Sequence, residues 1–132
     1  MRLLSKTKDG GKKSKVWAYW LVEIKGLLSI AILRFDNGSR DAYHTHAFHC
    51  ISWIIRGKLL EEFVDGRVNR YSRSIKPIIT KKQDFHRVTS EGRTWAFTIR
   101  GPWSKTWLEL DEERDRLTLS NGRVVEKRVS AK

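Results

Sequence analysis

Short apolar segments separated by turn residues run along most of the chain. Residues 16–24 (VWAYWLVEI) and 27–35 (LLSIAILRF) are rich in aromatic and branched side chains, and a Lys-Gly pair separates them. Segments of this composition and length are typical of β-strands. A short helix over residues 16–24 is the alternative for the first segment.

The same pattern continues toward the C-terminus. Asp-Gly at 65–66 and Asn-Gly at 121–122 are hairpin signals, and Gly57 is expected to turn the chain. Turn signals spaced about every 8–12 residues, with little sign of helix, are typical of an all-β sandwich or barrel. We predict an all-β fold, a small antiparallel β-barrel of the jelly-roll type. Apolar segments recur at 50–56, 59–64, 68–75, 76–80, 85–88, 94–101, 107–110 and 116–129.

The length of 132 residues suits one domain with one core. Residues 1–15 are polar and basic, so we expect a flexible leader there, followed by a single β-barrel domain over 16–129. The chain contains no apolar signal region and no apolar run of the about 20 residues that a membrane span needs. Cys50 is the only cysteine, which excludes an intrachain disulfide. We expect a cytoplasmic protein with no membrane partner.

The charge balance is strongly basic. The chain has 27 Lys and Arg against 15 Asp and Glu, a formal net charge of +12. Such a charge favours polyanions, nucleic acid among them, although a basic surface that only aids solubility is the alternative. No known nucleic-acid motif and no Gly-rich phosphate loop is present.

Three of the four histidines lie close together in the sequence. His44 and His46 are one residue apart, so in an extended chain their side chains point to the same face. His86 begins another predicted strand, and distant strands can meet across a barrel interior. Neutral imidazole is a good ligand for Fe, Zn, Mn or Ni. The sequence predicts that His44, His46 and His86 hold one divalent metal ion, with positions left open for water or substrate.

The next two residues of interest leave alternatives open. In strict alternation His49 points away from His44 and His46, but a β-bulge would turn it inward as a further metal ligand. Otherwise it caps the barrel mouth or faces solvent. Cys50 either supplies a thiolate ligand or is a small buried hydrophobe.

These motifs resemble the cupin superfamily, and more narrowly its short cupin-like proteins of bacteria and phages. The segments that carry the resemblance are HTHAFHCISWIIRGKLLEE from His44, FHRV around His86 and TWAFTIRGP from Thr94. The resemblance covers about residues 28–110. It implies a double-stranded β-helix, a metal held by the histidines, and a homodimer through strand pairing.

The chain departs from the cupin pattern in four places. Cys50 stands where a cupin often has a ligating Glu, Ala47 replaces a proline, and the glycines expected before the first motif and in the second are missing. A structural or interaction protein that has kept the cupin fold and lost the metal is therefore an alternative hypothesis.

Further residues are candidates to line the pocket. One of Glu61 and Glu62 is expected to face inward, and the resemblance favours Glu62 as a catalytic base or supporting group. Arg100, at the end of TWAFTIRG, is a candidate catalytic residue that would clamp a carboxylate or phosphate. In that segment Trp95, Phe97 and Ile99 are expected to pack the barrel. A surface position for Arg100 and solvated carboxylates for the two glutamates are the alternatives.

Two classes of function follow from these residues. The first is a small metal-binding protein, in its enzymatic form a dioxygenase, isomerase or similar, that acts on a small or anionic substrate of unknown identity. The second is a non-enzymatic basic β-barrel that binds or regulates through contact with nucleic acid.

Overall fold

The computed structural model describes residues 2–9, 14–37, 43–110, 115–120 and 124–130, and within them every regular element is a β-strand. The predicted all-β class is confirmed. In the described residues no helix has the length and apolar character needed to cross a bilayer. The strands are β1 (Arg2–Lys8), β2 (Val16–Ile24), β3 (Leu28–Phe35), β4 (Cys50–Phe63), β5 (Val68–Ser72), β6 (Ile78–Thr80), β7 (His86–Arg100), β8 (Thr106–Leu110), β9 (Arg116–Ser120) and β10 (Val124–Val129).

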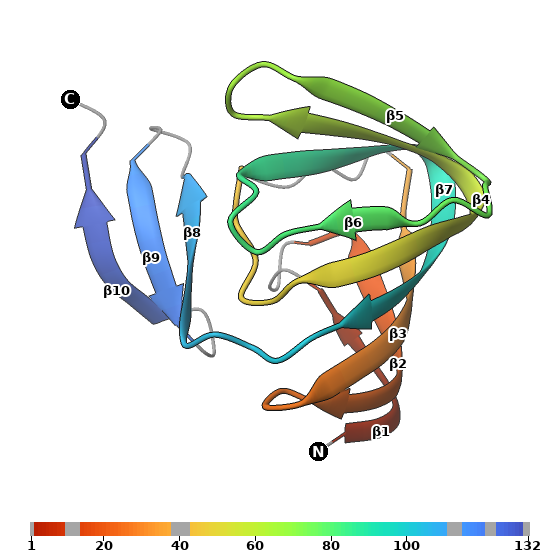
Figure 1. Cartoon of the computed structure of the whole chain (residues 1–132), viewed down its shortest axis with the longest axis horizontal. Coiled ribbons are helices and arrows are strands. Elements are labelled where there is room, and N and C mark those ends of the chain that lie inside the picture. The colour runs from red at the N-terminus through yellow and green to blue at the C-terminus, as the bar shows by residue number, and fades with distance from the viewer. Residues whose placement is uncertain (1, 10–13, 38–42, 111–114, 121–123, 131–132) are drawn as a thin grey trace.

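The strands form two antiparallel sheets (Figure 1). The larger has the order β1-β2-β3-β7-β4-β5, with β6 also paired to β4, and the smaller has the order β10-β9-β8. The sheets are not joined into one closed barrel, so the expected closure is wrong although the jelly-roll class is correct. A single residue, His44, forms isolated bridges to both His86 and Glu109 and so links the large sheet to the small one.

The N-terminal segment belongs to the large sheet. β1 pairs with β2 from Arg2 opposite Glu23 to Lys8 opposite Trp17. The flexible leader expected over residues 1–15 is therefore wrong for Arg2–Lys8, because backbone pairing with an edge strand orders a segment that has little to bury. Residues 10–13 of that leader lie outside the described residues.

Two long strands bend without breaking. Gly57 was expected to be a turn but lies within β4, at φ +101°, where the pairing with β7 shifts register between Ile54 and Lys58. A Cβ at Gly57 would come within 2.7 Å of the Thr94 Cα, so glycine permits both the backbone conformation and the close approach. The two apolar segments expected at 85–88 and 94–101 likewise belong to one strand, since β7 runs unbroken from His86 to Arg100.

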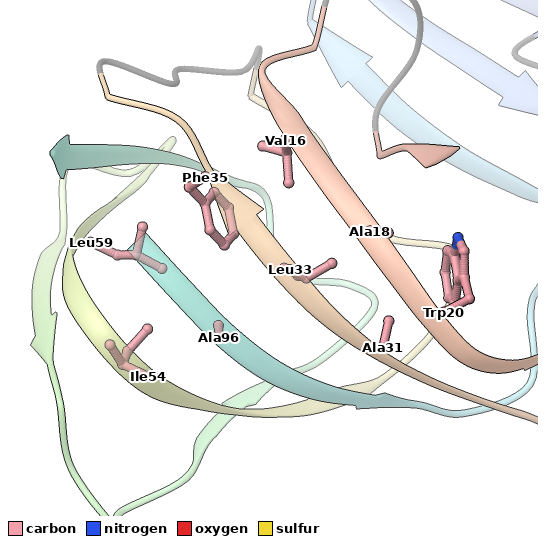
Figure 2. Packing of buried hydrophobic residues seen from close by; sticks show 9 residues of the cluster. All are labelled: Val16, Ala18, Trp20, Ala31, Leu33, Phe35, Ile54, Leu59 and Ala96. Carbon is pink, nitrogen blue, oxygen red and sulfur yellow. The ribbon is translucent and has the colours of Figure 1, made fainter. Parts of the chain in front are cut away.

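The core lies on the inner face of the large sheet (Figure 2). In the second half of β7 the buried positions are Thr94, Ala96, Thr98 and Arg100, and Trp95, Phe97 and Ile99 lie on the outer face. The expectation that those three pack the interior is wrong. Small side chains fill the inner face where the bend of β4 approaches Thr94. The cluster consists of Val16, Ala18, Trp20, Ala31, Leu33, Phe35, Ile54, Leu59 and Ala96.

Candidate metal centre

Backbone hydrogen bonds hold the first two histidines between the two sheets. The His44 amide donates to the His86 carbonyl at 2.7 Å, and the His86 amide donates back to the His44 carbonyl at 2.9 Å. The Thr45 amide donates to the Leu108 carbonyl of β8, and the Leu108 amide donates to Thr45 Oγ1, both at 2.8 Å. The segment that carries His44 and His46 is therefore fixed to β7 on one side and to β8 on the other.

This arrangement brings His44, His46 and His86 together, as the sequence predicts. One ring nitrogen of each lies within 4.8 Å of the others. His44 Nε2 and His46 Nε2 are 3.3 Å apart, and the His86 ring centroid is 5.1 Å from that of His44 and 5.0 Å from that of His46. Three imidazoles this close can share one cation, because each neutral ring offers a nitrogen lone pair to a metal ion.

Buried nitrogens without partners test whether the site fits a metal. His86 Nε2 and His46 Nδ1 are buried, and neither has a hydrogen-bond partner. Buried polar groups are nearly always satisfied, so a buried nitrogen with no protein partner in a native site points to a bound ion or water. The orphan on His86 belongs to the three-histidine cluster, and the residues present fit a divalent metal ion.

A carboxylate holds His86 in the orientation that a ligand needs. His86 Nδ1 donates to Glu61 Oε2, which fixes the proton on Nδ1 and leaves the Nε2 lone pair free. Glu61 also accepts from the Tyr71 hydroxyl at 2.7 Å. Burial by itself raises the pKa of Glu61, but the hydrogen bonds from His86 and Tyr71 outweigh it and hold the pKa below its usual value. Glu61 therefore remains ionised beneath the cluster.

Glu61 takes the position that the sequence analysis assigned to Glu62. Glu62 lies on the other face of β4, where Arg87 Nη2 donates to its Oε2 at 3.2 Å. The expectation that one of the pair faces inward is met, but the choice of Glu62 as the supporting group is corrected. Register shifts at Ile54–Lys58 change which residues of β4 face inward, and the sequence does not reveal how many residues such a bulge inserts.

His46 lies in surroundings that disfavour its protonated form. Burial lowers its pKa well below the usual value, and the nearby charges of His44, His86 and Arg100 lower it further. His46 is therefore neutral at physiological pH, which is the form that coordinates metal.

Aromatic rings lie beside two of the three imidazoles. The Phe48 ring lies 5.1 Å from that of His46, and the Trp103 ring lies 5.0 Å from that of Phe48. On the other side the Phe63 ring lies 6.0 Å from that of His86. These rings keep water away from the imidazoles on two sides and lower the local dielectric constant, which strengthens electrostatic interactions at the site.

Arg100 is buried, 4% exposed, and already has a carboxylate partner. Its Nη1 and Nη2 donate to Asp9 Oδ1 at 3.1 Å and Oδ2 at 2.7 Å. Burial by itself raises the pKa of Asp9, but the Arg100 guanidinium outweighs it and holds the pKa below its usual value. The inward orientation expected for Arg100 is present. Its bidentate contact, however, binds Asp9, the residue after β1, and not a free substrate group.

The two remaining sequence candidates lie apart from the cluster. His49 is exposed, and its Nδ1 accepts from the Lys82 amide at 3.1 Å. Cys50 begins β4, and burial raises the pKa of its thiol. Among the described residues the metal-competent group contains the other three histidines only, so the predicted inward turn of His49 is not observed. The irregular segment 45–49 leads its side chain outward instead.

Asp9 and Tyr71 are residues that the sequence analysis did not assign to the site. No signal in the sequence links Asp9 to Arg100, because the contact joins residues 91 positions apart. Glu61 was recognised as one of two candidates. Tyr71 could be assigned only with the strand register of the structure, which places β5 beside the inward-facing half of β4.

Comparison with known proteins supports the fold and leaves the activity open. Neither a family model nor a curated protein matches the sequence. A sugar phosphate isomerase of the cupin superfamily from Silicibacter pomeroyi is similar in structure, with a TM-score of 0.66, 8% identity, and coverage of 100% of this chain and 97% of that one.

Two further solved structures agree. A double-stranded β-helix protein from Klebsiella pneumoniae gives a TM-score of 0.61 at 13% identity and covers 77% of this chain and 90% of its own. The EutQ protein of Clostridium difficile gives 0.60 at 18% identity and covers 71% and 74%. The chain has the cupin fold, as the motifs around His44 and His86 predict.

Proposed function

We propose that this cupin-fold protein binds one divalent metal ion through His44, His46 and His86 and acts there on a small anionic substrate. The observation that carries the proposal is the orphaned, buried Nε2 of His86 beside two further imidazoles. Three protein ligands leave coordination positions open, which is the pattern of catalytic sites and not of closed structural ones. Fe, Zn, Mn and Ni all accept such a nitrogen set.

The residues around the cluster have defined tasks in this proposal. When bound, the metal supplies a Lewis acid that polarises an oxygen of the substrate or of water. Glu61 orients His86 and raises its basicity, as carboxylates do behind metal-bound histidines. Phe48 and Phe63 exclude water from the two flanks. Because Asp9 neutralises Arg100 beside the site, the positive charge that would favour an anionic substrate is that of the divalent ion itself.

Metal content tests the proposal directly. Protein purified without chelator and soaked in Zn²⁺, Mn²⁺, Ni²⁺ or, without oxygen, Fe²⁺ is expected to retain about one ion per chain by elemental analysis. His44→Ala and His86→Ala are expected to lose it, because two ligands bind far more weakly than three. His49→Ala is the matched control, since that imidazole lies outside the cluster. Wild-type protein that retains no ion, or equal retention by His44→Ala, would overturn the proposal.

A further inference from the structure

The outer face of the large sheet carries two rows of side chains that the metal centre does not use. Strand pairing places the first row directly across five strands, and neighbours paired in this way share a face. The second row lies beside it, offset by two residues on β1, β2, β3 and β7 and by three on β4, where the register shifts. The first consists of Lys8, Trp17, Arg34, Trp95 and Arg56, and the second of Lys6, Tyr19, Ile32, Phe97 and Trp53.

Cations and aromatic rings alternate in the first row. The ammonium of Lys6, from the second row, lies 4.5 Å from the Trp17 ring centroid, and that of Lys8 lies 5.5 Å from it. Arg34 lies over the Tyr19 ring at 5.9 Å and donates to the Tyr19 hydroxyl at 2.9 Å. The cations are therefore held beside the rings and not scattered over the surface.

The rings themselves form two neighbouring pairs. The centroids of Tyr19 and Trp95 are 5.8 Å apart, and those of Trp53 and Phe97 are 6.0 Å apart. All four side chains are half-buried, so one side of each is covered by the sheet and the remainder is accessible. Base–aromatic stacking is favourable for every base, because each base has a π-face.

Neither row contains a carboxylate. Among the described residues Asp36, after the end of β3, pairs with Arg34 of the first row at 3.1 Å and with Arg93 at 3.3 Å. The surface is therefore positive where the rings are accessible, in a chain whose net charge is +12. This charge fits a polyanion that also offers flat rings.

A second copy of the chain fits these rows poorly. In a two-fold dimer the same patch meets itself. Superposing the first row on its own reverse sets Lys8 against Arg56 and Arg34 against Arg34. Like charges placed opposite one another across an interface are unfavourable by several kcal/mol in general.

From these observations we propose that the two rows bind single-stranded nucleic acid, with bases on the aromatic rings and phosphates on the exposed Lys6, Lys8 and Arg56. A duplex hides its base faces in its own stack, so it would gain only the phosphate contacts. The binding does not use the metal centre, which lies on the inner face of the same sheet.

Fluorescence anisotropy with a 20-mer of deoxythymidine tests the proposal on the full chain. Lys6→Gln/Lys8→Gln removes two cations from the rows, and Arg73→Gln/Lys76→Gln removes two exposed cations from the β5–β6 connection as a matched control. Loss of two phosphate contacts is expected to reduce the slope of log K against log salt by about 1.4, or about 0.7 for each. At low salt the affinity is expected to fall about tenfold or more. The control is expected to keep the wild-type slope.

Two further arms separate stacking from charge. Trp17→Leu is expected to weaken binding with the salt slope unchanged, since a ring contact releases no counterion. His44→Ala is expected to bind the 20-mer as the wild type does, which keeps this test independent of the metal site. Equal loss in the Arg73/Lys76 control, or equally tight binding of a 20-base-pair duplex, would overturn the proposal. The proposal would also be overturned if the wild type bound no 20-mer and was a dimer by light scattering, and if Trp17→Leu was a monomer.

Discussion

Glu61→Gln isolates the contribution of a single negative charge behind the metal ligands. The substitution preserves the length and shape of the side chain, so the amide oxygen can still accept from His86 Nδ1 and from the Tyr71 hydroxyl. What changes is the charge. A neutral acceptor withdraws the Nδ1 proton less strongly, and His86 Nε2 becomes a weaker donor to the metal.

The expected loss is about 10- to 100-fold in metal affinity, the range that removal of such supporting groups typically produces. This corresponds to about 1.4–2.7 kcal/mol. The higher end is expected here because Glu61 and His86 are only 5% and 3% exposed, and solvent screens little of the lost interaction. Competition against a chromophoric chelator, with Zn²⁺ or Co²⁺, measures the change.

Glu62→Gln is the control, because it removes the same charge one residue away on the opposite face of β4. Its partner is Arg87 and not a metal ligand, so the metal affinity is expected to stay within about twofold of the wild type. Equal affinities of Glu61→Gln and wild type would refute the view that Glu61 tunes the site. An equal loss in both variants would show that only the net charge of the chain matters.

Three further predictions concern stability and the ligand set. Gly57→Ala is expected to lower the free energy of unfolding by about 3 kcal/mol or more, measured by urea titration, because its Cβ would meet the β7 backbone at 2.7 Å. Gly66→Ala has a similar φ of +96° but open space around it, so about 1 kcal/mol is expected, and equal losses would contradict the close-approach argument. Asp9→Asn is expected to cost about 3 kcal/mol at pH 7, since it leaves Arg100 buried without its counter-charge. The pKa of Asp9 is lowered in the fold, so its stabilisation is complete above the ordinary value of 3.8 and is lost as the pH falls through the lower folded value. The difference in the free energy of unfolding between wild type and Asp9→Asn should therefore become smaller in acid. A difference that does not change with pH would contradict the ion-pair explanation. Cys50→Ser is expected to leave the metal content unchanged, because burial raises the pKa of the thiol and keeps it protonated; loss of the ion would identify a thiolate ligand.

The sequence predicted the features that depend on local spacing. The period of two between His44 and His46 was enough to place both imidazoles on one side, and the position of His86 at a strand start brought it to the same place. The all-β class followed in the same way from short apolar segments and turn residues. For the strands and the His44–His46 spacing the physical constraint acts over a few neighbouring residues, whereas His86 meets the pair through a long-range backbone bridge to His44.

Features set by strand register were not predictable. Glycine at position 57 indicates a turn or a bulge equally well, and only the bulge keeps β4 continuous and brings Glu61 inward in place of Glu62. The orientation of Trp95 was misjudged for a related reason. Large apolar side chains usually face a core, but the inner face opposite the bend admits only small ones such as Thr94 and Ala96.

The pairing of Asp9 with Arg100 has a practical consequence for anyone who prepares this protein. The basic N-terminus resembles a dispensable tail, and trimming it would be a natural step before crystallisation. Deleting residues 1–9 would uncover the edge of β2 along its length and strip a buried guanidinium of its counter-ion at the same time. We expect such a shortened chain to aggregate through the bared strand, so affinity tags belong at the other terminus.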